Sequence, residues 1–271
     1  DDVLIEISHC GICHSDLHTA RNDWGGSKYP IVPGHEIVGH VRGTGDGVEG
    51  FADGDRVAVG CMVDSCMECD HCQQGLEQYC LNGGMTGTYN SIDRRDGSAT
   101  QGGYSDRIVV RKEFVLRIPD GMDMGAAAPL LCAGITTYSP LKTWDIGPGS
   151  KVAVAGLGGL GHMGVKLAAA MGAEVTVLTR TPDKIADAQS LGAKDILLST
   201  DRAAMKQAPP DPSHDAPGDA PHGAHDERMR RRCAASLGRP WGRQAQRPAQ
   251  PLLGGWLVKL ARHGAGKALP Q

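Results

Sequence analysis

The hydrophobic and polar positions of the first 120 residues form short apolar runs separated by Gly and Asp. Four of these runs are rich in β-branched and aliphatic residues, which favours β-strands. They are Val3–Ile7, Ile37–Gly39, Arg56–Val59 and Arg107–Val110. Residues 29–34 are predicted to be extended, because each Pro restricts the residue before it to β or polyproline conformations. The pattern predicts a β-rich unit with a barrel-like core.

The pattern then changes to alternating helical and strand segments. Apolar residues over Ala126–Tyr138 predict a helix that is broken near Pro129. Downstream, strands are expected at Lys151–Ala155, Glu174–Leu178 and Asp195–Leu198, with helices over residues 162–171 and 182–191. Strands that alternate with helices in this way predict a second, α/β unit with a parallel sheet.

The last 64 residues, from Ala208 onward, differ from both units. They contain nine of the sixteen Pro, a single β-branched residue (Val258), and no Ile, Thr, Phe or Tyr. A parallel sheet buries strands that are rich in such residues. We therefore expect a disordered or irregular tail, in which Leu252–Leu260 is a short apolar segment. Our hypothesis is a frameshift near codon 208 or a damaged gene, and the alternative is a genuine variant tail with a function of its own.

Composition and charge limit the classes of partner. The chain has 271 residues, 40% apolar content and a formal net charge of −3, which gives no electrostatic case for nucleic acid or membrane. No apolar run approaches the ~20 residues of a transmembrane helix. The opening DDVLIEIS lies inside a predicted strand and lacks a secretion signal, so we expect an incomplete N-terminus and a cytoplasmic protein. Nine Cys without an export signal favour metal binding or chemistry over disulfides.

The stretch from Cys10 to Glu36 holds several potential zinc ligands. A catalytic zinc takes three protein ligands, commonly Cys and His, and keeps a fourth position open. Cys13 and His35 are candidates for two of the ligands, and Cys132 is a candidate for the third. The alternative is that these Cys are small buried hydrophobic residues, as free Cys often is.

A second group of Cys follows the spacing Cys66-x2-Cys69-x2-Cys72-x7-Cys80. Four thiols at this spacing reach one tetrahedral ion, and a site with four Cys ligands is a closed, structural zinc site. The alternatives are a disulfide-paired or redox cluster, or a DNA-binding zinc finger. The last of these is weaker because neither a recognition helix nor a basic stripe accompanies the cluster.

The strand at Lys151–Ala155 runs directly into a G-x-G-x-x-G sequence that opens the next helix. This context makes the motif a dinucleotide fingerprint, in which glycines let backbone amides approach a pyrophosphate. The candidate cofactor-binding residues here are Gly156, Leu157, Gly158, Gly159, Leu160 and Gly161.

The end of the next strand indicates which dinucleotide is bound. An NAD enzyme usually carries an acidic residue there for the ribose 2′-hydroxyl. This chain has Thr179, Arg180 and Thr181 instead, followed by Lys184. Because Arg180 and Lys184 can face a 2′-phosphate, we predict NADP rather than NAD. The alternative is that both are ordinary surface charges.

Taken together, these segments resemble the zinc-dependent medium-chain alcohol dehydrogenases, in particular the cinnamyl alcohol dehydrogenase-like branch. The resemblance covers residues 1 to about 207. It rests on CGICHSDLH, YPIVPGHEIVG, GDRVAVG, CMECDHC with Cys80, GGYS, APLLCAGITTYSPL and GLGGLGHMGVKLAAAMGA.

The resemblance implies a role for each matching residue. Cys13, His35 and Cys132 would bind a catalytic zinc, Glu36 would approach that metal when its open position is empty, and Asp16 would orient a ligand His. The structural zinc would be held by Cys66, Cys69, Cys72 and Cys80. Ser15, His18 and Asp23 match the proton relay, Thr136 matches a residue beside the nicotinamide, and Thr179, Arg180, Thr181 and Lys184 match the 2′-phosphate site.

The resemblance implies a GroES-like catalytic domain (1–132), an incomplete Rossmann-type NADP-binding domain (133–207) and an aberrant tail (208–271). The implied activity is hydride transfer between NADP(H) and a primary alcohol or aldehyde, with two zinc ions. The alternative is a catalytically inactive zinc-binding fragment of such an enzyme. The family suggests a homodimer, although its dimer contacts lie largely in a region that we expect this chain to lack.

Overall fold

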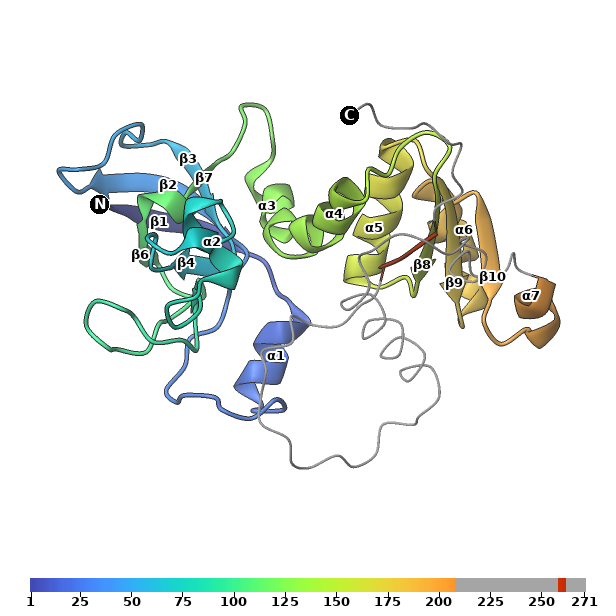
Figure 1. Cartoon of the computed structure of the whole chain (residues 1–271), viewed down its shortest axis with the longest axis horizontal. Helices are drawn as coiled ribbons and strands as arrows, with labels where there is room; N and C mark the ends of the chain where they lie inside the picture. Colours follow the sequence, from blue (N-terminus) through green and yellow to red (C-terminus); the bar gives the residue numbers. More distant parts are fainter. Residues whose placement is uncertain (208–257, 262–271) are drawn as a thin grey trace.

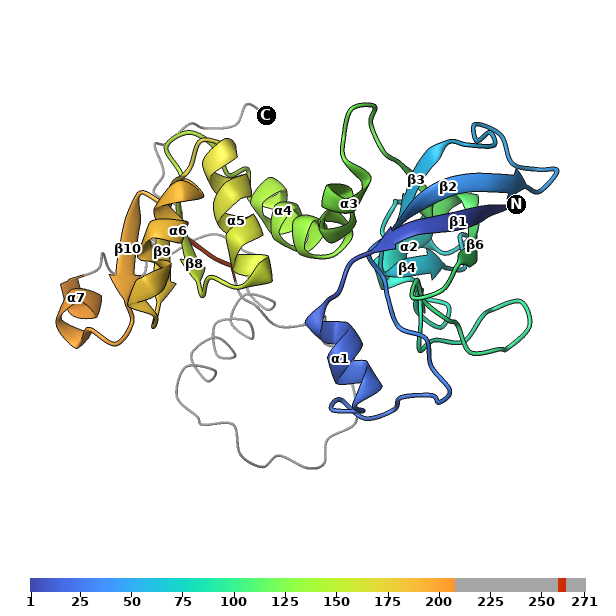
Figure 2. The ribbon, with the colours of Figure 1, turned by 180° about the vertical axis from the view of Figure 1, so that it is seen from behind.

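A computed structural model describes residues 1–207 and 258–261 of the chain (Figure 1). In this part, two main sheets lie on either side of a group of helices, as the views from the front and from behind both show (Figures 1 and 2). The larger sheet has five strands in the order β6-β1-β2-β3-β7, and the other has four in the order β10-β9-β8-β11. A two-stranded sheet pairs β4 with β5.

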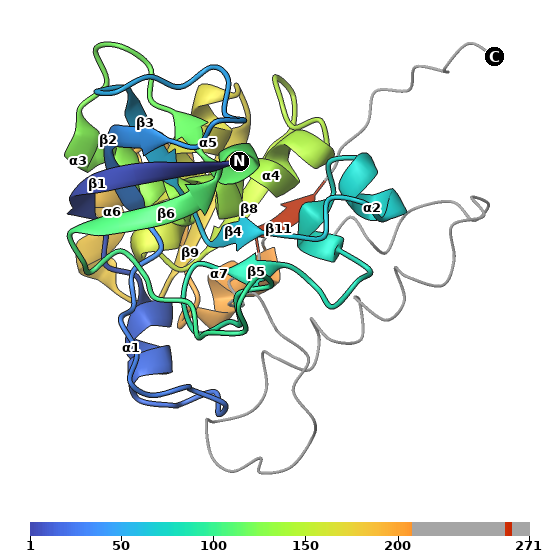
Figure 3. The same ribbon diagram turned by 90° about the vertical axis from the view of Figure 1, so that its left-hand side faces the viewer.

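The five-stranded sheet forms the core of the N-terminal unit, and Figure 3 shows β1 and β6 at its front. Its strands are β1 (Asp2–Cys10), β2 (Ile37–Thr44), β3 (Arg56–Val59), β6 (Arg107–Arg111) and β7 (Leu116–Arg117), all paired antiparallel. Burial alternates along β1, where Val3 and Ile5 are fully buried. Both faces of β3 are covered, because Val57 packs in the sheet core while Ala58 packs with Ala127.

Short elements surround this sheet. Helix α1 (His14–Ala20) follows β1, and the lobe between β3 and β6 contains β4 (Met62–Asp64), α2 (Asp70–Gln73), η1 (Glu77–Tyr79) and β5 (Thr86–Gly87). A turn of 3-10 helix, η2 (Lys112–Phe114), precedes β7. The sequence pattern did not predict α1, because His, Ser, Asp and Thr are weak helix formers and the helix depends on its cap.

The connection between the two sheets is helical. It consists of α3 (Met124–Ala127), η3 (Ala128–Leu131) and α4 (Ala133–Thr143). The predicted break near Pro129 is present as η3, and Cys132 (φ −124°, ψ −74°) separates η3 from α4. Helices α3 and η3 pack on the N-terminal unit through Ala127 and Ala128, whereas α4 packs on the other unit through Leu141.

The second unit has the expected alternation of strands and helices. It contains β8 (Lys151–Ala155), α5 (Gly159–Ala170), β9 (Glu174–Thr179), η4 (Pro182–Lys184), α6 (Ile185–Ser190), β10 (Asp195–Leu198) and α7 (Arg202–Gln207). Strands β8, β9 and β10 are parallel, and the Val side chains of β8 and β9 pack against Val165 and Ala168 of α5. Helix α5 begins at Gly159, three residues earlier than predicted, so that the glycine motif forms its first turn.

The predicted fold class, a GroES-like unit followed by a Rossmann-type unit, is confirmed. Most of the tail that we expect to be irregular lies outside the described residues. Its exception is β11 (Val258–Ala261), which pairs antiparallel with β8, in the register Val258 opposite Val154. Among residues 1–207 and 258–261, no helix has both the length and the apolar composition that crossing a bilayer requires.

Candidate metal centres and cofactor loop

Three distant segments bring four potential metal ligands together. Cys13 caps the start of α1, His35 and Glu36 immediately precede β2, and Cys132 lies between η3 and α4. Each offers one ligand atom, and all four atoms lie within 4.8 Å of one another. The Sγ atoms of Cys13 and Cys132 are 3.8 Å apart.

This donor set fits a zinc ion. Two zinc–sulfur bonds of about 2.3 Å at a tetrahedral angle place the sulfurs about 3.8 Å apart, which is the spacing of Cys13 and Cys132. His35 and Glu36 are both 5% exposed, so their ligand atoms face the protein interior rather than bulk water. Two thiols, one imidazole and one carboxyl group allow three ligands with a position left for exchange.

The buried carboxylate of Asp16 organises this cluster. It accepts hydrogen bonds from the backbone N–H groups of Cys13 (2.8 Å) and Gly34 (3.0 Å), from the hydroxyl of Tyr104 (3.0 Å), and from Nδ1 of His35 (3.1 Å). With Nδ1 of His35 bound to Asp16, Nε2 is the ring nitrogen that remains for a metal. The same carboxylate helps to cap α1, because Cys13 and Asp16 form a capping box.

Neighbouring groups and burial set the protonation states of the cluster. Burial opposes the charged forms of His35 and Asp16, but the hydrogen bond between them outweighs it. This bond raises the pKa of His35 to about 9 and lowers the pKa of Asp16 to about 2. The hydrogen bond from Cys132 lowers the pKa of the Cys13 thiol to about 3 and raises that of Cys132 itself. Burial raises the pKa of Glu36 to about 7. Cys13 is therefore held as the thiolate, the form of Cys that binds metals.

The residues assigned to a proton relay lie on and just after α1. Nδ1 of His18 is 2.9 Å from Oδ2 of Asp23, and the centroid of the His18 ring lies 4.9 Å from that of Trp24, with the two rings tilted by 32°. The His18 side chain is 37% exposed, so it has access to solvent. Ser15 is half-buried, and its backbone N–H donates to Sγ of Cys13 (3.5 Å). The structure thus pairs His18 with Asp23 and places the backbone N–H of Ser15 beside Cys13, a candidate metal ligand.

Two tyrosines at this cluster were not singled out from the sequence. The hydroxyl of Tyr104 donates to Asp16, and the ring of Tyr89 lies 5.6 Å from that of His35. The sequence marks the position of Tyr104 by the Gly102-Gly103 pair before it. The chain packs closely here, because a Cβ on Gly103 would collide with Ile37. Cys10 is half-buried and does not belong to the cluster.

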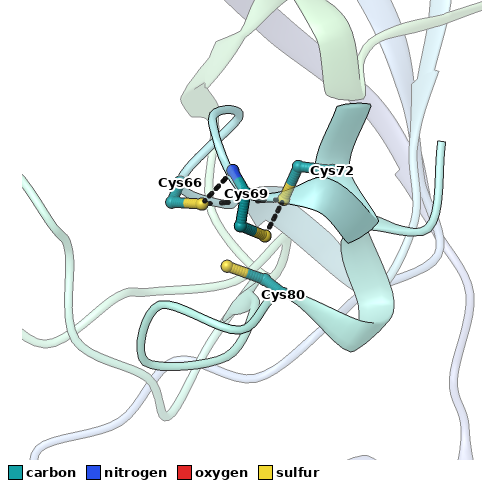
Figure 4. Close-up of side chains that lie close together, drawn as sticks. All are labelled: Cys66, Cys69, Cys72 and Cys80. Atoms are coloured by element: carbon teal, nitrogen blue, oxygen red, sulfur yellow. Dashed lines mark hydrogen bonds between the residues drawn. The ribbon is translucent and has the colours of Figure 1, made fainter. Parts of the chain in front are cut away.

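The second group of thiols converges in the lobe between β4 and β5 (Figure 4). The ligand atoms of Cys66, Cys69, Cys72 and Cys80 all lie within 4.8 Å of one another. Sγ of Cys72 is 3.8 Å from that of Cys66 and 3.5 Å from that of Cys69. Both distances are close to the sulfur–sulfur separation of about 3.8 Å in a tetrahedral zinc site. All eight Cys in residues 1–207 are free thiols, and the four of this lobe fit a closed zinc site.

The glycine motif forms the turn between β8 and α5. Gly156 has φ +87°, a left-handed conformation that favours Gly. A Cβ on Gly161 would collide with the carbonyl oxygen of Gly156, so the close approach of helix and turn requires Gly at both positions. Leu157, Gly158, Gly159 and Leu160 complete the turn and the first residues of α5. The N-terminal amides of α5 are therefore available to an anionic group.

The four residues assigned to a 2′-phosphate follow β9 but differ in environment. Thr179 is buried, and its hydroxyl accepts a hydrogen bond from the backbone N–H of Thr181 (3.2 Å). Nζ of Lys184 donates to the carbonyl oxygen of Leu157 (2.8 Å), which links this segment to the glycine turn. Arg180 is exposed. Thr136, assigned to the nicotinamide, is exposed on α4 one turn after Cys132.

Comparison with known proteins shows which proteins this chain resembles. Residues 1–120 match the alcohol dehydrogenase GroES-like domain. The chain is 60% identical over 200 residues to NADP-dependent alcohol dehydrogenase C 1 of Mycolicibacterium smegmatis, covering 74% of this chain and 57% of that protein. It is 56% identical over 200 residues to the aldehyde reductase YahK of Escherichia coli, covering 73% and 57%. The chain thus spans little more than half the length of these relatives.

Solved structures give the same result. Cinnamyl alcohol dehydrogenase SbCAD4 of Sorghum bicolor superposes with a TM-score of 0.74 at 48% identity, covering 76% of this chain and 59% of that one. CAD from Helicobacter pylori, complexed with NADP(H), superposes with a TM-score of 0.70 at 48% identity, covering 73% and 56%. Residues 1–120 are therefore an alcohol dehydrogenase GroES-like domain, and residues 1 to about 207 resemble the cinnamyl alcohol dehydrogenase-like branch of the zinc-dependent medium-chain alcohol dehydrogenases.

Proposed function

We propose that this chain is, or derives from, an NADP-dependent zinc oxidoreductase that interconverts primary alcohols and aldehydes. The observation that carries the proposal is the convergence of Cys13, His35 and Cys132, with Asp16 on the far nitrogen of His35. The names of the relatives agree, since they include NADP-dependent alcohol dehydrogenases and an aldehyde reductase. Aromatic alcohols are a further candidate class, because the related structures include cinnamyl alcohol dehydrogenases.

The residues that would hold the two metals follow from the donor sets. Cys13, His35 and Cys132 would bind the catalytic zinc, with Glu36 as an alternative fourth ligand, and the four Cys of the lobe would bind the structural zinc. When bound, a catalytic zinc is a Lewis acid toward the oxygen of an alcohol or aldehyde, and a nicotinamide cofactor exchanges the hydride. The remaining steps belong to side chains of this chain.

The proton of the alcohol needs a route to solvent. Ser15, whose backbone N–H donates to Sγ of Cys13, would exchange a proton with the substrate oxygen through its hydroxyl. His18, whose Nδ1 is held by Asp23 at 2.9 Å, would pass the proton to water, to which its side chain is 37% exposed. Asp23 would keep the ring in one orientation.

The cofactor would bind at the turn between β8 and α5. The amides at the start of α5 would receive the pyrophosphate, Thr136 would face the nicotinamide, and Thr179, Arg180, Thr181 and Lys184 would receive the 2′-phosphate. The proposed domain boundary between residues 132 and 133 places Cys132 at the junction, since α3 packs on one unit and α4 on the other. The domains proposed are 1–132 and 133–207, with 208–271 as the tail.

The cofactor preference gives a direct test. Arg180→Asp should lower kcat/KM with NADPH and spare kcat/KM with NADH, because the new carboxylate repels the 2′-phosphate. Lys166→Gln, which removes an exposed charge from α5, is the matched control and should leave the ratio unchanged. A wild-type kcat/KM that is higher with NADH than with NADPH would contradict the NADP assignment.

A second candidate function is a zinc-binding fragment that does not catalyse. Two observations favour it: the match spans 57% of the first relatives, and β11 pairs antiparallel where a doubly wound sheet continues with parallel strands. Both candidates bind zinc, so NADPH titration and turnover with the whole chain distinguish them. Translating the coding DNA after codon 208 in its other two frames tests the frameshift hypothesis, which requires that one of them restores strands and helices of the family type.

The proposed partner is a small alcohol or aldehyde rather than nucleic acid or a membrane. The free thiols of residues 1–207 suit a reducing compartment, and we propose the cytoplasm. A homodimer stays a prediction from the resemblance, and analytical ultracentrifugation of the whole chain tests it.

A further inference from the structure

Arg94 reaches from the loop after β5 into the four-Cys lobe. Its Nη2 lies 3.7 Å from Sγ of Cys80 and 2.8 Å from the carbonyl oxygen of Asn82, and it also donates to the carbonyl of Gly84. One guanidinium group therefore contacts a candidate metal ligand and two backbone acceptors of the segment that follows it. A planar guanidinium carries five N–H donors, which suits contact with several acceptors at once.

The other three thiols of the lobe have different neighbours. Cys66 accepts from the backbone N–H of Cys69 (3.4 Å) and from Nδ2 of Asn82 (3.5 Å). Cys69 accepts from the backbone N–H of Leu81 (3.3 Å), and Cys72 lies 3.2 Å from the hydroxyl of Ser65. Cys80 also lies beside the backbone N–H groups of Cys66 and Asn82, and within residues 1–207 and 258–261 Arg94 is the charged side chain that donates to it from another loop.

The positive charge of Arg94 complements the negative charge expected of a four-thiolate zinc site. Four thiolates around one Zn²⁺ leave a net charge of −2, and a thiolate sulfur accepts hydrogen bonds without donating any. Sγ of Cys80 and the carbonyl oxygen of Asn82 both face Arg94, so two acceptors share one cationic donor. Outer contacts of this kind orient metal ligands and change metal affinity, typically by 10- to 100-fold.

We propose that Arg94 is a positioning residue for the four-Cys zinc site, which holds the Cys80 thiolate and the Asn82–Gly84 segment in their metal-binding geometry and offsets part of the negative charge of the site. The proposal rests on the zinc assignment made above for this lobe. Because Arg94 is exposed, we expect an effect at the low end of that range, a rise of about tenfold in the rate of zinc release when Arg94 is replaced.

The neighbouring residue provides a matched control. Arg95 has the same charge and lies in the same loop, but its guanidinium pairs with Asp93 (2.8 Å) and Asp2 (2.6 Å). Arg95→Gln therefore removes a charge and loosens the loop without touching a thiol. A role that is only structural for the loop would make the two arginine variants alike.

The first experiment measures zinc release from the whole chain under a chromogenic chelator, in a Cys132→Ser background that separates the four-Cys lobe from the other cluster. Arg94→Gln should release zinc about tenfold faster than this background, Arg94→Lys should fall between them, and Arg95→Gln should match the background. Equal rates for Arg94→Gln and Arg95→Gln would overturn the proposal. If the background protein itself contains no zinc, the metal assignment of the lobe fails as well.

A second readout reports on the thiolates directly. With Co²⁺ in place of zinc in the same background, the loss of a hydrogen bond to Cys80 should shift the sulfur-to-cobalt charge-transfer absorption to lower energy. The shift is expected in Arg94→Gln and absent in Arg95→Gln. Identical spectra for Arg94→Gln and the background would show that Arg94 does not act on the metal ligand, whatever its effect on stability.

Discussion

The two candidate metal centres show how differently one protein can assemble similar donor sets. The four-Cys lobe takes all its ligands from residues 66–80, and its thiols are held by hydrogen bonds from neighbouring backbone and from Arg94. The Cys13 cluster takes its ligands from positions 13, 35, 36 and 132, and is arranged around the buried Asp16. The four-Cys lobe is a local site that joins residues close in sequence, whereas the Cys13 cluster depends on the whole fold of the N-terminal unit.

The two sites also differ in whether they can take part in a reaction. Four thiols fill every position of a tetrahedral ion, so the lobe can stabilise the fold but offers no position to a substrate. Two thiols and one imidazole leave a position open, Glu36 belongs to the same cluster, and Ser15 and His18 follow Cys13 on α1. We therefore expect changes at the two centres to have separable effects on turnover, metal content and stability.

Cys132→Ser should have the largest effect on activity. It removes a thiol that lies 3.8 Å from Cys13, so the chain should lose one of its two zinc ions and all turnover. Metal analysis and NADPH-coupled assays measure both. Cys10→Ser removes a half-buried thiol outside the cluster and should keep two zinc ions, whereas full activity of Cys132→Ser with unchanged zinc would refute the assignment.

Cys80→Ser should have the largest effect on stability. A structural zinc contributes on the order of 10 kcal/mol to folding, and the lobe has few large apolar residues to replace it. We expect a much lower midpoint of thermal unfolding with the zinc of the Cys13 cluster retained. Cys61→Ser, at a free thiol outside both clusters, is the control. A wild-type midpoint for Cys80→Ser would show that the lobe holds no stabilising metal.

Asp16→Asn tests how the Cys13 cluster is organised. The substitution keeps the shape of the side chain but removes the charge that faces Nδ1 of His35 at 3.1 Å. Zinc affinity of this cluster should fall by roughly 10- to 100-fold, while the four-Cys lobe should be unaffected. Competition with a chelator measures this, and Asp183→Asn, at an exposed position, is the control. Equal affinity in both variants would exclude an orienting role for Asp16.

Glu36→Gln should have a smaller effect, visible as a pH dependence. Burial raises the pKa of Glu36 from 4.5 to about 7, so between these values the folded chain binds a proton that the unfolded chain has released. The contribution of Glu36 to the free energy of unfolding of the zinc-free protein should therefore fall as the pH rises from about 4.5 to 7. Glu36→Gln should remove this contribution, so that the free energy of unfolding of the variant rises with pH relative to that of the wild type over this window.

Cys13, whose pKa is lowered to about 3, acts in the same window with the opposite sign, because its folded thiolate has released a proton that the unfolded thiol keeps. His35 and Asp16 act mostly outside the window. The contribution of His35, whose pKa is raised to about 9, is lost as the pH rises through about 9, and that of Asp16, whose pKa is lowered to about 2, is lost as the pH falls through about 2. Denaturant titrations at several pH values measure the slope of the free energy of unfolding against pH. An unchanged slope in Glu36→Gln would show that another group carries it.

The same contrast explains what the sequence revealed. The spacing of Cys66, Cys69, Cys72 and Cys80 is local, so it indicates a metal site without any structure. The identity of Cys13 rather than Cys10 as a ligand came from the family resemblance, because no spacing rule connects residues 13, 35 and 132. The strands and the glycine turn were predictable from their apolar runs and from G-x-G-x-x-G, since both are local signals.

Features without an apolar period or a known sequence motif were not predictable. Helix α1 lacks an apolar period and depends on the capping box of Cys13 and Asp16. Tyr104 reaches Asp16 across 88 positions of sequence, and Arg94 reaches Cys80 from a loop whose own sequence gives no sign of a metal. The pairing of β11 with β8 was equally hidden, because a Pro-rich tail contains only a short apolar segment.

The zinc content of the whole purified chain tests the account most directly. Inductively coupled plasma mass spectrometry, referenced to protein concentration from amino-acid analysis, gives the number of zinc ions per chain. The two clusters predict two zinc ions, one in the four-Cys lobe and one at Cys13, His35 and Cys132. A value of one or none in protein purified without chelators would contradict the presence of two metal centres.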